Sequence, residues 1–233
     1  MRTTALVALM LGLAMPAYSI DTSEYHCPDY SEHIDALDYV EPKALSGSLS
    51  QDEIECLEQG FSKATKQTDR SKISRVLVAN AMVNDTDEWM RLVRRHLDEV
   101  EQSDPDISYL YATHLFNQEQ PNFDAVIKYA DLAWERRADR WEGKTFTTRS
   151  HHLLRLKALA RIKMWERAEE AAVNGNDDKK AFAEKKKLEA HTAAREWLDF
   201  DRASEFGWTE AAHVCVSTGS DAACGLKDGW RQQ

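Results

Sequence analysis

The histidines are the residues of this 233-residue chain best suited to chemistry at neutral pH, because imidazole titrates and binds metals there. Two of them, His151 and His152, are adjacent within a stretch that is expected to be helical. Neighbouring side chains on a helix point about 100° apart, so this pair is poorly placed to hold one metal ion. We expect one packed and one exposed imidazole. His96 and His114 fall on apolar helix faces, which favours half-buried structural side chains.

No motif of a familiar catalytic class accompanies these histidines. The patterns H-E-x-x-H and G-x-S-x-G and a phosphate-binding glycine loop do not occur in the sequence. We therefore predict that the chain is not an enzyme and uses no cofactor. The alternative hypothesis is a metal-handling or hydrolytic protein that uses its histidines and acidic residues.

Four cysteines favour two disulfides in an exported chain, and four cysteines allow three pairings. We expect local pairing, Cys27 with Cys56 and Cys215 with Cys224. The first bridge would hold a short N-terminal piece on the first long helix and contribute about 3 kcal/mol by restricting the unfolded chain. The alternative is a zinc site with His26 beside Cys27, although the sequence has no C-x-x-C pair.

Charge is unevenly distributed along the chain, whose net charge is −10. Residues 20–60 carry eleven acidic side chains and one basic side chain, whereas bases dominate residues 136–163. Two explanations stay open: the two regions pair with each other, or they bind partners. The overall acidity argues against nucleic acid as a partner, because phosphate binding requires a positive face.

The N-terminus has the three parts of a secretory signal. Arg2 supplies a positive charge, residues 5–15 form an apolar run, and residues 17–19 offer small side chains to a signal peptidase. The apolar run is shorter than the roughly 20 residues that span a bilayer. We predict a signal peptide over residues 1–19, cleavage near Ser19, and an exported mature chain, periplasmic or secreted, without a membrane span.

Composition favours an all-α protein, because Gly and Pro are scarce while Ala, Leu, Glu, Lys and Arg are abundant. After the signal peptide we expect an acidic N-terminal segment over residues 20–49. A helical-repeat domain is expected over residues 50–216, followed by a C-terminal disulfide loop and tail over residues 217–233.

Capping and helix-breaking residues separate the expected helices. Ser50 and Glu53 form a capping box, and Asn122 is the cap of another helix. The expected helices cover residues 31–39, 50–61, 71–83, 85–100, 109–116, 122–136, 147–163, 165–172, 177–200 and 204–215.

The helix over residues 122–136 has a partial copy 34 residues earlier in the chain. The overlay places Trp89 on Phe123, and a third copy places Trp165 over the same position at the longer spacing of 42. Each aromatic residue is expected at the start of the second helix of a pair, where it would fill the mouth of the hairpin. A repeat of this kind indicates helical hairpins that bury their core by stacking.

Four residues of the stretch FDAVIKYADLAWE follow the second-helix pattern of a known repeat: Phe123, Val126, Ala130 and Ala133. The chain therefore resembles the tetratricopeptide repeat (TPR) family over about residues 71–173. It lacks the glycine of the family's first helices and the proline that usually ends a unit. The resemblance implies an all-α fold of antiparallel helical hairpins, stacked as a short right-handed TPR-like solenoid with a concave binding face.

The same resemblance implies a scaffold for protein or peptide interaction. Proteins of that family often hold peptides on the concave face through Asn, Lys and Arg side chains. The candidate binding residues are Asn80, Arg149, His152, Arg155, Lys157 and Arg161.

Overall fold

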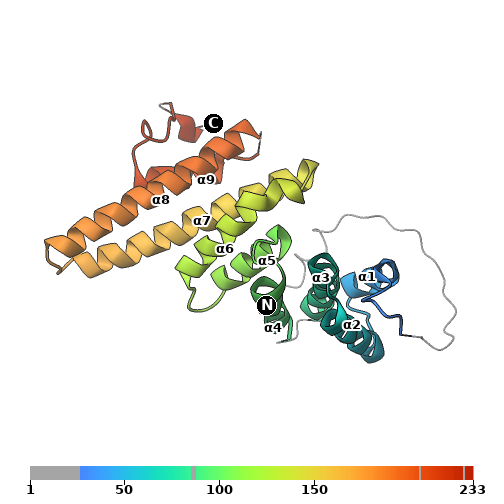
Figure 1. Cartoon of the computed structure of the whole chain (residues 1–233). Coiled ribbons are helices and arrows are strands. Elements are labelled where there is room, and N and C mark those ends of the chain that lie inside the picture. Colours follow the sequence, from blue (N-terminus) through green and yellow to red (C-terminus); the bar gives the residue numbers. More distant parts are fainter. Residues whose placement is uncertain (1–26, 85–87, 205, 228, 233) are drawn as a thin grey trace. The chain divides into compact units, whose positions relative to one another are not determined.

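The computed structural model describes residues 27–84, 88–204, 206–227 and 229–232. These residues fall into two compact units, the first ending at Gln102 and the second beginning at Ser103. Figure 1 shows helices throughout the described parts, and no strand occurs among them. The predicted all-α class is confirmed. The predicted signal peptide and His26 lie outside the described residues. Within the described residues, no helix has the length and apolar character needed to cross a membrane.

The first unit is built around one buried helix. Its elements are η1 (Ile34–Ala36), α1 (Leu37–Leu45), α2 (Gln51–Lys63), α3 (Gln67–Val83), α4 (Glu88–Arg95) and the π-helix η2 (His96–Val100). The helix α3 packs against α1, α2, α4 and η2. Its sequence explains this position, because apolar side chains such as Ile73, Leu77 and Val78 cover most of its surface and are buried.

Two local sequence features position α2: a capping box at its first turn and a glycine near its end. The Ser50 hydroxyl accepts the Glu53 N–H at 3.2 Å, and the Glu53 carboxylate accepts the Ser50 N–H at 2.8 Å. The predicted capping box is therefore confirmed. Upstream, buried Tyr30 packs on α2 at Gly60, where an added Cβ would lie 2.8 Å from the Tyr30 Cβ. Glycine at position 60 permits this close approach.

The cysteines lie at bonding distance in the predicted pairs. Cys27 and Cys56 have an S–S distance of 2.07 Å, and Cys215 and Cys224 have one of 2.11 Å. The first pair links α2 to the segment that precedes α1. The second pair links α9 to the turn that follows it.

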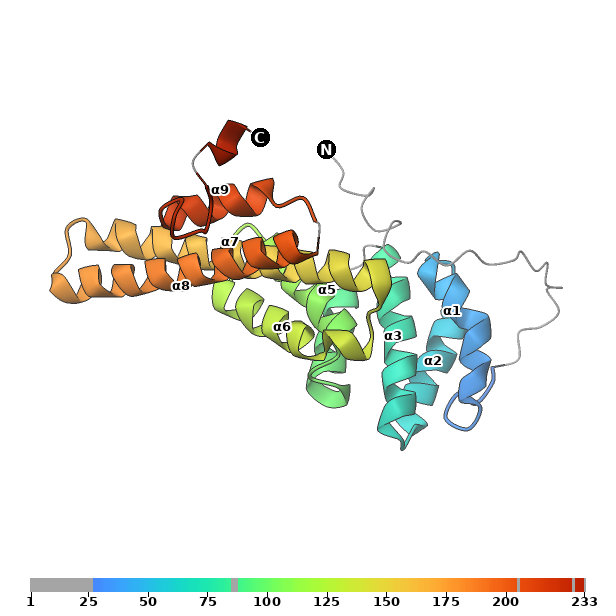
Figure 2. The same cartoon turned by 90° about the horizontal axis from the view of Figure 1, so that it is seen from above.

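The second unit is a series of helices in which each packs on the next. Its elements are α5 (Pro105–Phe116), α6 (Phe123–Arg136), η3 (Arg137–Asp139), α7 (Gly143–Ala172), α8 (Asp177–Ala203), α9 (Thr209–Thr218) and η4 (Trp230–Gln232). The successive pairs α5–α6, α6–α7, α7–α8 and α8–α9 are all in contact. Figure 2 shows α7 and α8 side by side over most of their length, with α9 beside α8.

Several expected helix boundaries were wrong. The two helices expected over residues 147–163 and 165–172 are one helix of 30 residues, α7. Residues 144–174 contain neither Gly nor Pro, so nothing in the backbone ends the helix near Trp165. Trp165 therefore lies inside a helix, and the third copy of the repeat does not begin one.

Smaller differences occur at several other helices. The helix α3 begins at Gln67 instead of residue 71, and α5 begins at Pro105 instead of residue 109. The segment expected to be helical over residues 31–39 continues to Leu45 with Pro42 inside α1. Proline has a helix-compatible φ, and its missing N–H costs one bond to the preceding turn. The helix α9, expected over residues 204–215, starts at Thr209 and runs to Thr218.

Alanines form the contact between α7 and α8. Ala158 on α7 and Ala194 on α8 are fully buried, and Ala193 is nearly so. They belong to one apolar cluster with Trp197 and Leu198, which extends to α9 through Ala211, Ala212 and Cys215. Small side chains let the two helix backbones approach closely, and the larger residues then fill the space around them.

We predict that Ala194→Leu destabilises the second unit by about 1–3 kcal/mol, because the added carbons have no space in a packed core. Urea unfolding followed by circular dichroism measures the change. Ala181→Leu, at an exposed position of the same helix, controls for the substitution itself and is expected to be near neutral. Equal stability of the two variants would contradict the described packing of α7 on α8.

Candidate functional site

The predicted partner-binding bases all lie on α7, and each pairs with a carboxylate from a different helix. Arg149 contacts Asp106 of α5, and Lys157 lies 2.6 Å from Asp131 of α6. Arg161 lies 3.3 Å from Glu189 of α8, and Arg155 lies 2.9 Å from Glu210 of α9. The positive charges of these four bases are therefore matched by acids of neighbouring helices. A role for these bases in binding a partner stays a prediction.

Acidic residues of the N-terminal region are matched in the same way inside the first unit. Lys43 lies 2.6 Å from Glu53, Arg95 lies 2.6 Å from Glu58, and Lys63 lies 3.4 Å from Asp29. These three acids do not need a partner molecule to balance their charge.

Asn80, the asparagine among the predicted binding residues, makes a structural contact in the first unit. It is buried on α3, and its Oδ1 accepts the backbone N–H of Leu49 at 3.3 Å. The side chain thus holds the connection between α1 and α2 against α3.

His151 and His152 are both partly buried, so the expectation of one exposed imidazole was wrong. His152 Nδ1 lies 2.7 Å from the hydroxyl of Tyr109 on α5. His151 Nδ1 lies 2.8 Å from the carboxylate of Asp201 on α8 and 3.1 Å from Trp197 Nε1. The two imidazoles bond to different helices, in agreement with their expected divergence on a helix.

An imidazole oriented by a carboxylate is the arrangement used by many general bases. Asp201 is 0 % exposed, and its Oδ2 has no hydrogen-bond partner among the described residues. Burial raises the pKa of Asp201, while its hydrogen bonds to His151 and Trp197 act in the opposite direction. The His151 ring stacks on Phe206 with a centroid distance of 4.0 Å and meets Trp197 edge-on. These covered surfaces are typical of a structural link between α7 and α8.

A groove that sequence reasoning did not predict lies where α6, α7 and α8 meet. Its cavity volume is about 650 Å³. It lies between the start of α6, the last turns of α7 and the first turns of α8. We call it the α6–α7–α8 groove. The lining residues are Pro121, Asn122, Phe123, Asp124, Met164, Arg167, Ala168, Ala171, Asp178, Lys179, Phe182 and Lys186.

The groove follows from local sequence features of the three helices. Asn122 caps α6 by accepting the Ala125 N–H at 3.1 Å, which places Phe123 in the first turn. Phe123 is buried in the floor, and the Arg167 guanidinium lies 4.6 Å from its ring centroid. Ala168 of α7 packs with Ala183 of α8 in a small buried cluster that brings these helices together beside it.

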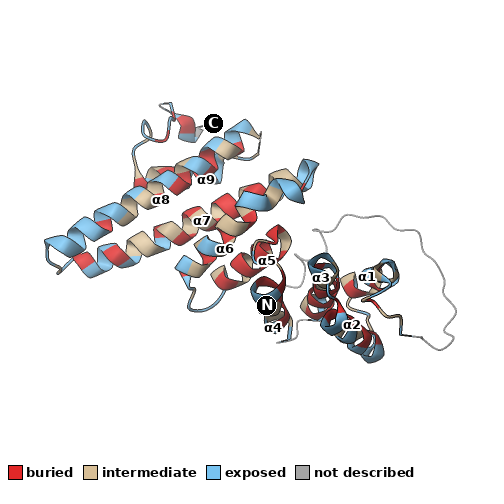
Figure 3. Ribbon diagram, in the orientation of Figure 1, coloured by how far each residue is buried: buried red, intermediate tan, exposed pale blue. Residues whose placement is uncertain are grey.

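The groove combines an apolar floor with a basic edge. Phe182 is 52 % exposed, and it lies between two alanines in an otherwise charged stretch of α8. Arg167 and Lys179 have no carboxylate partner among the described residues, whereas Lys186 lies 2.9 Å from Glu189. In Figure 3 this end of α8 is mostly in the colour of exposed residues. The sequence signal that points to this site is Phe182 itself, a large apolar residue within the lysine-rich stretch DDKKAFAEKKK.

A second cavity, of about 480 Å³, includes two predicted bases, Lys157 and Arg161, together with Leu188 and Thr192. Both bases of this cavity are paired with the acids described above, so we regard the α6–α7–α8 groove as the better candidate site.

Burial lowers the pKa of His152, and the charges of Arg155 and His151 lower it further. The unfolded chain therefore binds a proton at His152 more readily than the folded chain does. The stability contributed by neutral His152 is present above the ordinary value of 6.5 and is lost as the pH falls below it.

We predict that the thermal unfolding midpoint of the second unit decreases from about pH 7 to about pH 5 and that His152→Gln reduces this decrease. Scanning calorimetry of both proteins across that interval measures the difference. His33→Gln, at an exposed histidine, controls for the loss of one imidazole. Identical pH profiles for wild type and His152→Gln would refute the assigned cause.

No family model matches the chain, and neither the curated proteins nor the solved structures contain a match to it. The function is therefore inferred from the geometry of the chain's own residues.

Proposed function

We propose that this chain is an exported, TPR-like helical scaffold that binds an acidic peptide segment of a partner protein in the α6–α7–α8 groove. The proposal assigns no catalytic activity to the chain. The observation that carries it is a groove with a half-exposed phenylalanine and two cationic side chains, Arg167 and Lys179, that have no acidic partner among the described residues.

The size and lining of the groove support a binding role. A volume of about 650 Å³ falls within the range of ligand clefts, which are mostly apolar with a few polar groups. Phe123, Met164 and Phe182 would contact apolar side chains of the peptide. Burying the exposed part of Phe182 would contribute about 1 kcal/mol or more.

Two bases of the groove, Arg167 and Lys179, can contact an acidic ligand; the groove lining also contains two acids, Asp124 and Asp178. Arg167 can form paired hydrogen bonds to a carboxylate, because its guanidinium presents parallel N–H donors. Lys179, on the opposite wall, adds a second positive charge within the lining. A basic peptide would place like charges together at both positions.

The order of helix contacts supports the repeat architecture. The hairpin α5–α6 is followed by α7–α8, and each helix packs on the next along the chain. The length of α7 departs from a regular repeat, because this helix of 30 residues is longer than α6, the helix of 14 residues before it. This additional length creates the free surface on which the proposed ligand binds.

Export is supported by the cysteines. Both pairs lie at disulfide distance, and disulfides persist in oxidising compartments. A secretory signal over residues 1–19, as predicted from the sequence, would deliver the chain there.

The test is selection from a random peptide library followed by affinity measurements on the purified protein. We expect the selected peptides to combine Asp or Glu with bulky apolar residues. Their binding should weaken with added salt, because exposed charges are screened.

Groove variants then locate the binding site. Phe182→Ser and Arg167→Glu should each weaken binding about tenfold or more, equivalent to about 1.4 kcal/mol. Leu188→Ser is the matched control, because Leu188 is an exposed apolar residue of the same helix that does not line this groove. Unchanged affinity in both groove variants, or selected peptides without acidic residues, would exclude the proposed function.

A further inference from the structure

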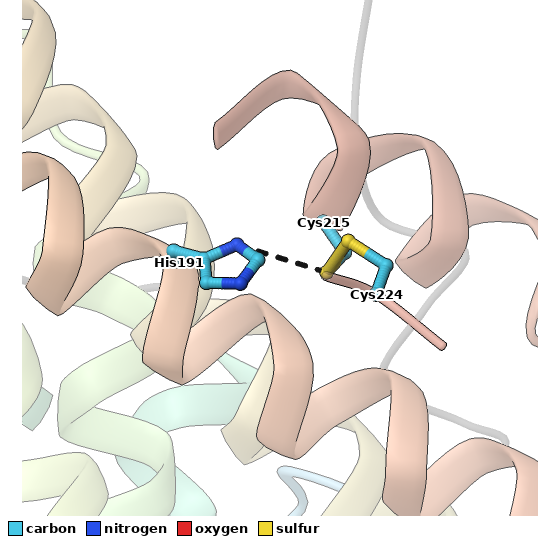
Figure 4. Close-up of side chains that lie close together, drawn as sticks. All are labelled: His191, Cys215 and Cys224. Atoms are coloured by element: carbon cyan, nitrogen blue, oxygen red, sulfur yellow. Dashed lines mark hydrogen bonds between the residues drawn. A yellow bond between two sulfur atoms is a disulfide. The ribbon is translucent and has the colours of Figure 1, made fainter. Parts of the chain in front are cut away.

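Three potential metal ligands lie together where α8 meets α9. His191 is on α8, Cys215 is on α9, and Cys224 is in the turn that follows α9. One ligand atom from each residue lies within 4.8 Å of the others. Figure 4 shows the imidazole directed at the disulfide, and its Nδ1 is 3.9 Å from Cys215 Sγ.

The position of the imidazole is fixed by its neighbours. His191 Nδ1 lies 3.1 Å from Thr218 Oγ1, and the Thr218 hydroxyl donates to the Cys215 carbonyl at 2.8 Å. Thr218 Oγ1 therefore accepts from the His191 Nδ1–H. A Cβ added at Gly219 would lie 2.5 Å from His191 Cε1 and 2.7 Å from Nδ1. The absence of a side chain at Gly219 gives the ring its place beside the sulfurs.

We propose that, when the Cys215–Cys224 disulfide is reduced, His191, Cys215 and Cys224 bind a thiophilic divalent cation of the zinc class. Zinc prefers tetrahedral sites with sulfur at about 2.3 Å and imidazole nitrogen at about 2.0–2.1 Å, which places ligand atoms about 3.5–3.8 Å apart. The distance from His191 Nδ1 to Cys215 Sγ is already 3.9 Å. The two sulfurs, 2.11 Å apart in the disulfide, have to separate, and His191 Nδ1 has to release Thr218 Oγ1.

Reduction of the Cys215–Cys224 disulfide precedes metal binding. A dithiol reductant gives two electrons and two protons to the disulfide, which becomes two thiols, and the dithiol becomes a disulfide. The cation then displaces both thiol protons into solvent. The imidazole binds as a neutral ligand through Nδ1, and its proton moves to Nε2.

The charge and burial of the three ligands fit a bound divalent cation. Two thiolates cancel the charge of a divalent cation, so the buried site carries no net charge. Cys215 and Cys224 are fully buried, while His191 is partly exposed and offers the route of entry. Three protein ligands leave a fourth position for a water molecule. Metal binding at this site therefore depends on the redox state of the cysteines.

The test uses Co²⁺ as a spectroscopic probe and the full chain purified under a phosphine reductant in the absence of oxygen. The background variant C27S/C56S removes the other two thiols, so Cys215 and Cys224 are the only ones left. We expect one equivalent of Co²⁺ with thiolate charge-transfer bands and tetrahedral d–d bands, displaced by Zn²⁺. The oxidised protein should bind none.

Two further variants distinguish a three-ligand site from a simple dithiol. His191→Ala should weaken binding about a hundredfold or more, since loss of even an outer-shell partner costs about 10–100-fold. Gly219→Ala removes no ligand but pushes the imidazole aside, so it should also weaken binding. Its backbone is extended, with φ −147°, which any residue adopts. Gly207→Ala, where a Cβ meets open space, is the matched control.

The proposal is overturned if the reduced protein binds no stoichiometric Co²⁺. It is also overturned if C215S/C224S in the otherwise unchanged chain binds as tightly as the wild type. Equal affinity for Co²⁺ in His191→Ala, Gly219→Ala and the control would show that the His191 imidazole is not a ligand, which contradicts the proposal. If C27S/C56S fails to fold, comparison of the reduced wild type with C215S/C224S gives the same decision.

Discussion

The close approach of α7 and α8 is the contact on which the second unit depends. Fully buried alanines on both helices allow it, and Trp197 and Leu198 fill the space beside them. This contact places Asp201 against His151 and gives α9 a surface on which to pack. It also brings the last turns of α7 beside the first turns of α8, where the α6–α7–α8 groove opens. Side chains that contain only a methyl group thus position every candidate site of this unit.

Charge on α7 has a structural use as well. Four bases along this helix pair with acids on four different helices, α5, α6, α8 and α9. Ion pairs at partly exposed positions contribute little energy individually. Their distribution nevertheless specifies which helix lies on each side of α7, because a displaced neighbour would leave its acid and the α7 base apart. These four bases of the basic stretch are therefore explained by contacts within the unit. Two further bases, Arg167 and Lys179, line the groove without a carboxylate partner among the described residues.

Much of the fold could be predicted from the sequence, because its signals are local. The capping box at Ser50, the cap at Asn122 and the apolar pattern of α3 each depend on a few neighbouring residues. The continuity of α7 was missed because an aromatic residue at position 165 was interpreted as the start of a repeat. The groove and the ion pairs could not be predicted, since Phe123, Arg167 and Phe182 come together only through three packed helices. Nor does sequence spacing show that His191 lies beside two cysteines that follow it by 24 and 33 residues.

The order of contacts in the second unit has a consequence for how the chain folds. The helices α5 to α9 pack mainly on their neighbours along the chain within this unit. Contacts between sequence neighbours require little loop-closure entropy, and proteins dominated by them fold quickly. Each new helix finds its principal partner already synthesised, so assembly can proceed in the direction of translation. Cys215 and Cys224 follow α8 and are nine residues apart, so their disulfide can form only after the helices α5 to α8 have been synthesised.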